Sequence, residues 1–226
     1  MTWIDLGNPT PKLSPERYTL VRWQTGEIYQ LAARTGSASL SFDQVLESRR
    51  TEREFGGLDD TQLGSLLWQA CRCQETWSSP LGFDLEHRAA PSAGAIHPIH
   101  VLINKPGDLR WWLYQPQGHY LVELINAAER LAGLLKHSSE VLEGPQAVRV
   151  LFVAEPGKTM AKYDEGYSLV WRDAGALLAV MALTAHAQGL NFCPLGITGE
   201  PWARSLADEG QLIGVGVGLL GLAARS

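Results

Sequence analysis

The sequence predicts an α+β fold, in which a sheet is covered by layers of helices. Three segments carry this prediction. Residues 167–188 form a long apolar segment without proline, which favours a helix. Residues 110–114 and 119–123 resemble the two strands of a hairpin, and residues 148–154 are a continuous apolar run typical of a buried strand. Helices and strands mixed with a hairpin along one chain are characteristic of α+β domains.

The long apolar segment is expected to be the hub of the core. It is apolar nearly all round rather than along one stripe, which predicts burial on most of its sides. Charge is confined to Arg172 and Asp173, and Gly189 follows as a suitable C-terminal cap. Its many small residues allow another backbone to come close, so the segment is also a candidate dimer interface.

The remaining elements are predicted from local signals. Ser41 begins a short helix over residues 44–50, and Asp59 or Asp60 is a suitable N-cap for an amphipathic helix over residues 63–73. Further expected elements are a helix or strand within 18–33, a strand at 99–104, a helix at 127–137, a strand that turns at 191–196, a helix at 201–209 with Glu200 as cap, and a glycine-punctuated strand from 211.

Composition limits the class of protein. The 226 residues, 45% apolar and 19% charged, suit one large domain or two small ones with an ample core. A net charge of −5 argues against a general nucleic-acid surface. The three cysteines have no disulfide or metal spacing, which indicates a reducing compartment. The N-terminus has no apolar segment and the run 174–183 is too short to span a membrane, so a cytoplasmic protein is expected.

The first candidate site is the stretch 47–55, ESRRTEREF. Arg49, Arg50 and Arg53 surround Thr51 in a loop before a helix. Planar guanidinium groups and a hydroxyl are typical of a phosphate clamp. Taken alone, the same residues are more typical of a solvated helix end, whose charge is balanced by Glu47, Glu52 and Glu54.

The second candidate is the loop at residues 88–98, RAAPSAGAIHP. Its small residues let a ligand approach the backbone, and Ser92 and Gly94 are placed to donate to a ligand or to admit one. An ordinary turn accounts for the same pattern.

The third candidate is the pair Lys162-Tyr163, just ahead of the long apolar segment. A lysine at the positive end of a helix dipole is disfavoured as a cation, by roughly 0.3–1 kcal/mol. Such a lysine is a candidate general base. The alternative is an exposed pair on a loop, with Asp164 and Glu165 balancing the charge.

Four stretches in this order resemble the FMN-dependent nitroreductase superfamily, and more narrowly the SagB-type dehydrogenases, the azoline oxidases of ribosomal-peptide natural-product pathways. They are SRRTEREF (48–55) with LGSLLWQACRC behind it, APSAGAIHP (90–98), AKYDEGYSLVWRDAGALLAVMALTAHAQGL (161–190) and NFCPLG (191–196). The resemblance implies a nitroreductase-like fold, a central mainly antiparallel sheet flanked by helices with a long buried central helix. It makes 41–226 the FMN-binding domain and 1–40 an N-terminal extension.

The resemblance also implies a homodimer with FMN at its interface and a small-molecule or modified-peptide substrate. Charge, apolar run length and residue spacing indicate no nucleic-acid partner, no membrane and no metal. Lys162 and Tyr163 match the catalytic pair, while Ala176, Ala179 and Val180 stand where relatives usually have polar residues. The residues that it assigns to FMN are Arg49, Arg50, Thr51 and Arg53 at the phosphate and ribityl chain, Ser92 and Gly94 along the flavin, Pro194, Leu195 and Gly196 facing the ring and its N5, and Arg225 in the tail.

The reaction implied is the oxidation of an azoline-like heterocycle. Lys162 would be the base or its tuner, Tyr163 would orient the substrate, and N5 of FMN would accept the hydride before oxygen regenerates the flavin. The alternatives are an NAD(P)H-dependent nitro or quinone reductase and an FMN-free scaffold subunit of a peptide-modifying complex.

Overall fold

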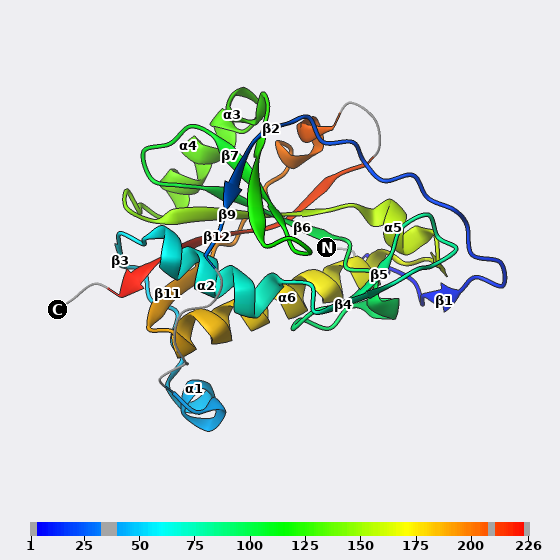
Figure 1. Ribbon diagram of the computed structural model, residues 1–226, viewed down its shortest axis with the longest axis horizontal. Helices are drawn as coiled ribbons and strands as arrows, with labels where there is room; N and C mark the ends of the chain where they lie inside the picture. Colours follow the sequence, from blue (N-terminus) through cyan, green and yellow to red (C-terminus); the bar gives the residue numbers. More distant parts are fainter. Residues whose placement is uncertain (1–3, 33–39, 208–210, 224–226) are drawn as a thin grey trace.

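The computed structural model describes residues 4–32, 40–207 and 211–223. Its centre is a sheet in which every recorded strand pairing is antiparallel, as the sequence analysis expected (Figure 1). The strand order is β11 (Leu190–Pro194), β12 (Ile213–Ala223), β9 (Val148–Ala154), β6 (Ile99–Asn104), β7 (Trp111–Gln115), β8 (Tyr120–Leu124) and β2 (Thr25–Gln30), with β3 (Phe55–Gly56) paired to the end of β12.

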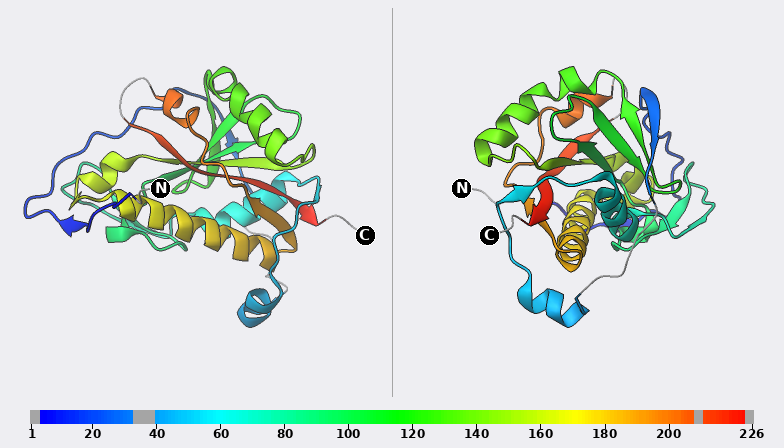
Figure 2. Two further views of the ribbon diagram at one scale, coloured as in Figure 1. Left: turned by 180° about the vertical axis from the view of Figure 1, so that it is seen from behind. Right: turned by 60° about the vertical axis from the view of Figure 1, so that its left-hand side comes forward.

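Helices cover both faces of this sheet (Figure 2). On one face, α2 (Asp60–Cys71) and α6 (Tyr167–Ala187) bury a core against alternate residues of the strands, such as Val101 and Ile103 of β6. On the other face, α3 (Ala127–Arg130) and α4 (Ala132–Val141) pack against the residues between them, such as Leu102. Because successive strand residues point to opposite faces, one short strand serves both cores.

The long helix α6 begins and ends close to its predicted bounds, and Gly189 after it has a φ of +71°. Its burial differs from the expectation. The buried residues, which include Val170, Ala174, Leu177 and Met181, form one stripe toward the sheet. Trp171, Gly175 and Ala179 on the outer side are exposed, Trp171 by 41%. The expectation of burial on most sides is therefore wrong for the single chain.

Local capping signals proved reliable. Ser41 and Gln44 form a capping box at the start of α1 (Phe42–Ser48), and Asp59 and Gln62 form another at the start of α2. The helix predicted at 201–209 is instead a 3-10 helix, η2 (Ala203–Leu206), and part of the prediction lies outside the described residues. The Glu200 side chain accepts from the backbone N–H of Gly214 rather than capping a helix.

The shorter elements lie outside the central sheet. They are β1 (Thr10–Pro11) paired with β10 (Tyr163–Asp164), β4 (Glu75–Trp77) paired with β5 (Leu85–His87), η1 (Ala93–Ala95) and α5 (Pro156–Met160). Helix α1 projects from the body near the C-terminal end of α6, and its Phe42 and Leu46 are exposed (Figures 1 and 2).

The strand β2 within residues 1–40 is the edge of the central sheet. The domain boundary at residue 41 stays a prediction.

Among the described residues, α6 is the one helix whose length and hydropathy suffice to cross a membrane. Its buried stripe nevertheless packs on α2 and the sheet, as the core helix of a folded domain does. The run 174–183 alone is too short to span a membrane, whereas the full helix Tyr167–Ala187 is long and apolar enough. The cytoplasmic location stays a prediction.

Candidate functional site

The arginine stretch leaves the end of α1 and runs to β3. Arg49 donates to the Thr51 hydroxyl (3.4 Å), and Arg50 donates to the backbone oxygens of Glu47 and Arg49 (3.1 and 2.9 Å). Within the described part of the chain, no carboxylate lies within ion-pair distance of Arg49, Arg50 or Arg53. The neighbouring glutamates therefore do not neutralise these guanidinium groups by direct contact, and an anion can bind to them.

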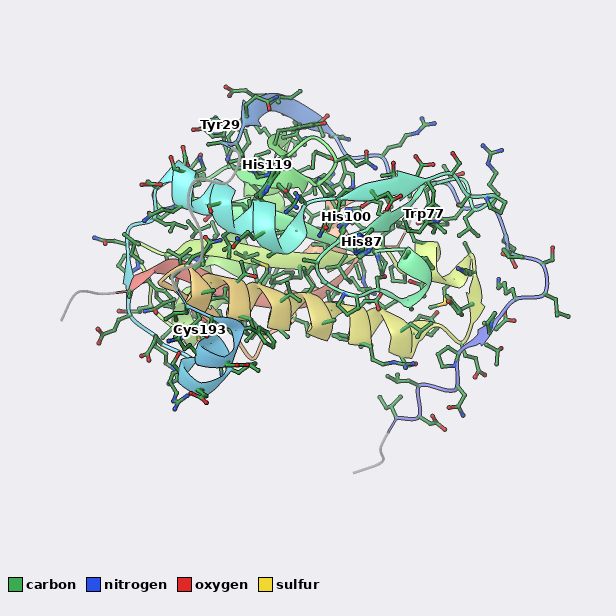
Figure 3. The ribbon with its side chains drawn as sticks, turned by 60° about the horizontal axis from the view of Figure 1, so that its bottom comes forward. Tyr29, Trp77, His87, His100, His119 and Cys193 are labelled. Carbon is green, nitrogen blue, oxygen red and sulfur yellow. The ribbon has the colours of Figure 1, made fainter. Side chains whose placement is uncertain are left out.

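The turn Pro194–Leu195–Gly196 lies beside this stretch. Asn191 of β11 donates to the backbone oxygen of Glu54 (2.9 Å). Burial raises the pKa of the Cys193 thiol, and the nearby cation of Arg53 acts in the opposite direction. Figure 3 places Cys193 at the end of the molecule where α1 lies.

The turn itself is open to an approaching group. Pro194 and Gly196 are exposed, and a Cβ added to Gly196 would meet no atom within 4 Å. The backbone N–H of Leu195 donates to the Val217 oxygen of β12 (2.8 Å), which fixes the turn to the sheet. The structure therefore brings Arg53 and the turn together at the edge of the sheet that β11 forms.

A second group forms around the loop at residues 92–97. The Ser92 hydroxyl and the Ala93 N–H donate to the buried carboxylate of Asp173 on α6 (2.6 and 3.1 Å). Burial raises the pKa of Asp173, although these two hydrogen bonds act to lower it. Gly94 has a φ of +65°, and a Cβ there would lie 2.8 Å from Lys162 Nζ and 2.9 Å from the Tyr163 hydroxyl. The positive φ and these close approaches disfavour a side chain at Gly94, and the loop lies against Lys162 and Tyr163.

Lys162 and Tyr163 are half-buried, with the ammonium 5.8 Å from the centre of the Tyr163 ring. The strand β10 separates Lys162 from the start of α6, so the lysine does not lie directly at the helix terminus. The carboxylate of Asp164 lies 3.9 Å from Lys12 rather than against Lys162. Asp164 therefore does not balance the charge of Lys162 by direct contact, as the alternative expected.

The two groups lie at opposite ends of α6. Asp173 holds the Ser92 loop, whereas His186 near the other end contacts the Ser48 hydroxyl of α1 (2.8 Å). A helix rises by about 1.5 Å per residue, so these contacts are roughly 20 Å apart along α6. One chain therefore does not gather all the residues assigned to FMN. Arg225 lies outside the described residues.

The comparison with protein families decides the class. Residues 46–208 match the model of the family described as "Nitroreductase family". This chain belongs to the nitroreductase family.

Solved structures of nitroreductase-like proteins have the same fold, which confirms the expected fold class. One from Ralstonia eutropha JMP134 has a TM-score of 0.63 at 20% identity, with 96% of this chain and all of that chain covered. The Escherichia coli microcin synthetase McbBCD complex, with truncated pro-MccB17 bound, gives 0.57 at 16% over 84% and 76%. A Desulfovibrio desulfuricans protein in complex with FMN gives 0.53 at 19% over 83% and 88%. The search of curated proteins found no match.

In this member of the nitroreductase family a third group of residues went unnoticed in the sequence. Glu155, which follows β9 and is 1% exposed, accepts from the Val21 N–H (2.6 Å) and from His100 Nε2 (2.8 Å). Burial alone would raise its pKa, but the hydrogen bonds from His100 and Val21 and the nearby cation of Lys158 bring it below the usual value. Burial lowers the pKa of His100, so the imidazole is neutral and donates to an ionised carboxylate.

The same group contains Glu86, Arg88 and Lys158. Glu86 forms a 2.5 Å ion pair with Arg88 and accepts from Gln117 (2.9 Å). Lys158 of α5 is buried and donates to the backbone oxygen of His97 (3.0 Å). The 86–88 and 155–158 pairs come from segments about seventy residues apart, so nothing in the sequence indicated that the two pairs meet. The one local indication was the sequence Glu155-Pro156, a charge directly after a continuous buried strand.

Proposed function

We propose that the protein is an FMN-dependent oxidoreductase of the SagB type, a dehydrogenase that oxidises an azoline-like heterocycle or a related natural-product intermediate. The observation that carries the proposal is the pairing of unneutralised arginines with an open backbone turn on one side of the sheet. Guanidinium groups match the geometry of a phosphate with pairs of N–H donors. The neighbour from Desulfovibrio desulfuricans, which is in complex with FMN, supports the same cofactor.

Two sets of residues would contact the flavin, one at its phosphate end and one at its ring. Arg49, Arg50, Thr51 and Arg53 would hold the phosphate and ribityl chain. The Pro194–Gly196 turn would face the ring, because no side chain fills the space above Gly196. When bound, FMN would supply an acceptor for two electrons and a hydride.

A homodimer would complete the site. Ser92 and Gly94 lie at one end of α6 and the arginines at the other, which leaves each half incomplete in one chain. The exposed outer side of α6, with Trp171, Gly175 and Ala179, offers a stripe of small and aromatic residues. An isologous contact along this stripe would place the two ends of neighbouring helices together.

Lys162 and Tyr163 would act on the substrate from the Ser92 loop. Lys162 is the general base, or the residue that tunes it, and would take the proton from the ring carbon. Tyr163 would orient the heterocycle through its hydroxyl, which lies close to Gly94. The microcin synthetase neighbour, which has a truncated pro-peptide bound, supports a peptide-derived substrate. The cytoplasm is the compartment proposed.

The first experiment is an absorption spectrum of the purified protein. Bands of bound flavin are expected, and their absence after reconstitution with FMN would favour the scaffold function. Rapid bleaching by NADPH would identify a nitro or quinone reductase, whereas bleaching by a thiazoline-containing peptide would identify the dehydrogenase.

Two arginine variants and one matched control test the arginine contacts. Hydrogen bonds to charged groups contribute roughly 1.5–3 kcal/mol each, so Arg53→Ala or Arg49→Ala should weaken FMN binding at least about tenfold. Arg204→Ala is the control, because Arg204 is exposed in η2 and pairs with Glu200. Equal flavin retention by all three variants after dialysis would remove the phosphate assignment.

A further inference from the structure

A cavity of about 290 Å³ opens where β6 and β7 separate. These strands are paired only at Leu102–Leu113 and Ile103–Trp112, so they diverge toward Ile99 and Gln115. The lining includes none of the residues assigned to FMN. Leu20 and Gln117 in its wall are exposed, which opens it to solvent.

Lys158 in the wall of this cavity has no direct ion-pair partner in the described part of the chain. Its side chain is buried, with 8% of the residue exposed. Nζ donates to the His97 carbonyl (3.0 Å) and lies 5.0 Å from the centre of the Phe83 ring. A carbonyl and an aromatic ring satisfy a buried ammonium only partly, because neither cancels its full charge.

The charged groups around Lys158 do not replace the missing partner. Arg88 is a like charge, whereas Glu86 and Glu155 are opposite charges. Both carboxylates are engaged elsewhere, Glu86 with Arg88 and Glu155 with His100. His97, like His100, is neutral, because burial lowers its pKa to about 4.

Burial lowers the pKa of Lys158 most and repulsion by the Arg88 cation is the second cause, which together bring it from 10.5 to about 8. Near pH 7 the fraction of neutral amine is then about 300-fold larger than for an ordinary lysine. Desolvation and an adjacent cation both lower the pKa of lysine and so activate it as a nucleophile.

We propose that Lys158 is an imine-forming residue that captures a small aldehyde or ketone in the cavity between β6 and β7. The neutral amine attacks the carbonyl carbon, a C–N bond forms, and the π electrons of the carbonyl move to oxygen. The two amine protons and the carbonyl oxygen then leave as water, and a C=N bond remains. No oxidant or reductant is needed.

The cavity limits the size and the character of the ligand. Water occupies about 30 Å³ per molecule, so the volume corresponds to roughly ten waters and suits a ligand of similar atom count. Trp23 and Leu20 provide apolar walls, and Gln115 and Gln117 provide amides. A short aliphatic or aromatic carbonyl compound matches this lining.

The test uses the full-length protein, butanal as the probe, and cyanoborohydride to trap the imine as a stable amine. Peptide mapping then gives the labelling rate of each lysine. Lys136 is the reference, because it is exposed on α4. At pH 7 we expect Lys158 to be labelled at least about tenfold faster than Lys136.

The pH dependence separates a reactive amine from a merely accessible one. The ratio of Lys158 to Lys136 labelling should be largest at or below pH 7 and should fall above pH 8, because the Lys158 amine is then already mostly neutral and its neutral fraction no longer rises with pH. Equal rates at pH 7, or labelling of Lys158 only after unfolding, would overturn the proposal. Lys158→Arg should lose the mapped label and keep the others. If that variant does not fold, the comparison within the parent protein still decides.

Discussion

Replacing Glu155 should destabilise the protein more than any surface substitution. Its carboxylate accepts from the Val21 N–H and from His100, and thereby ties the N-terminal segment to the end of β9. Hydrogen bonds to a charged group contribute about 1.5–3 kcal/mol each, and unpaired buried donors carry a similar cost. We therefore expect Glu155→Ala to lower the free energy of unfolding by about 3–5 kcal/mol, a large part of the 5–15 kcal/mol of a typical domain.

Urea denaturation followed by tryptophan fluorescence measures this loss. The Trp23 ring packs edge-to-face with the His100 ring, with 5.2 Å between the ring centres, so its fluorescence reports on the same region. Glu155→Gln keeps the size and one acceptor, so it should cost about half as much. Glu143→Ala, at an exposed position, is the control and should change stability by less than about 0.5 kcal/mol. A loss under about 1 kcal/mol in Glu155→Ala would refute the reasoning.

The pH dependence gives an independent check. The pKa of Glu155 is lower in the folded protein than its ordinary value of 4.5. Its stabilising contribution is thus fully present above pH 4.5 and is lost as the pH falls through the folded-state value. The free energy of unfolding of Glu155→Gln should therefore fall less steeply with acid than that of the parent.

Three further predictions concern the proposed activity and the thiols. Ala179→Lys should give a monomer that loses flavin, whereas a flavinated dimer by size-exclusion chromatography with light scattering would show that α6 is not the interface. Lys162→Ala should keep its flavin but slow flavin reduction by a thiazoline peptide about 10²–10⁴-fold, and a change under about threefold would leave the residue a structural role. A thiol reagent should titrate Cys73 alone in the native protein, because Cys71 and Cys193 are buried and burial raises the pKa of Cys71 to about 12; three native thiols would contradict this.

The sequence predicted those parts of the fold that depend on local signals. The caps at Ser41 and Asp59, the bounds of α6 and the strand Val148–Ala154 all follow from neighbouring residues. The membership of β2 in the sheet did not, because it pairs with β8 about a hundred residues later. Strand partners at that separation leave no mark in a short window of sequence.

The candidate site shows the same limit. The Arg53 region and the Pro194 turn were predicted from a resemblance in motif order, and the structure places them side by side. The sequence favours Lys162 as the unusual lysine, yet the buried lysine is Lys158, four residues earlier. The burial of Lys158 depends on Phe83 and His97, which reach it from other segments. Which of the two nearby lysine side chains is desolvated therefore depends on tertiary packing.

The position of β12 has a consequence for how the chain matures during synthesis. This strand comes after all the others in the sequence, yet it lies between β9 and β11 in the sheet. Until residues 213–223 have left the ribosome, both neighbours expose unpaired backbone edges, which are templates for aggregation. Contacts between distant parts of a chain also form slowly. The nascent protein should therefore depend on chaperones until β12 is inserted, and a stop codon before Ile213 should yield aggregates rather than a smaller folded unit.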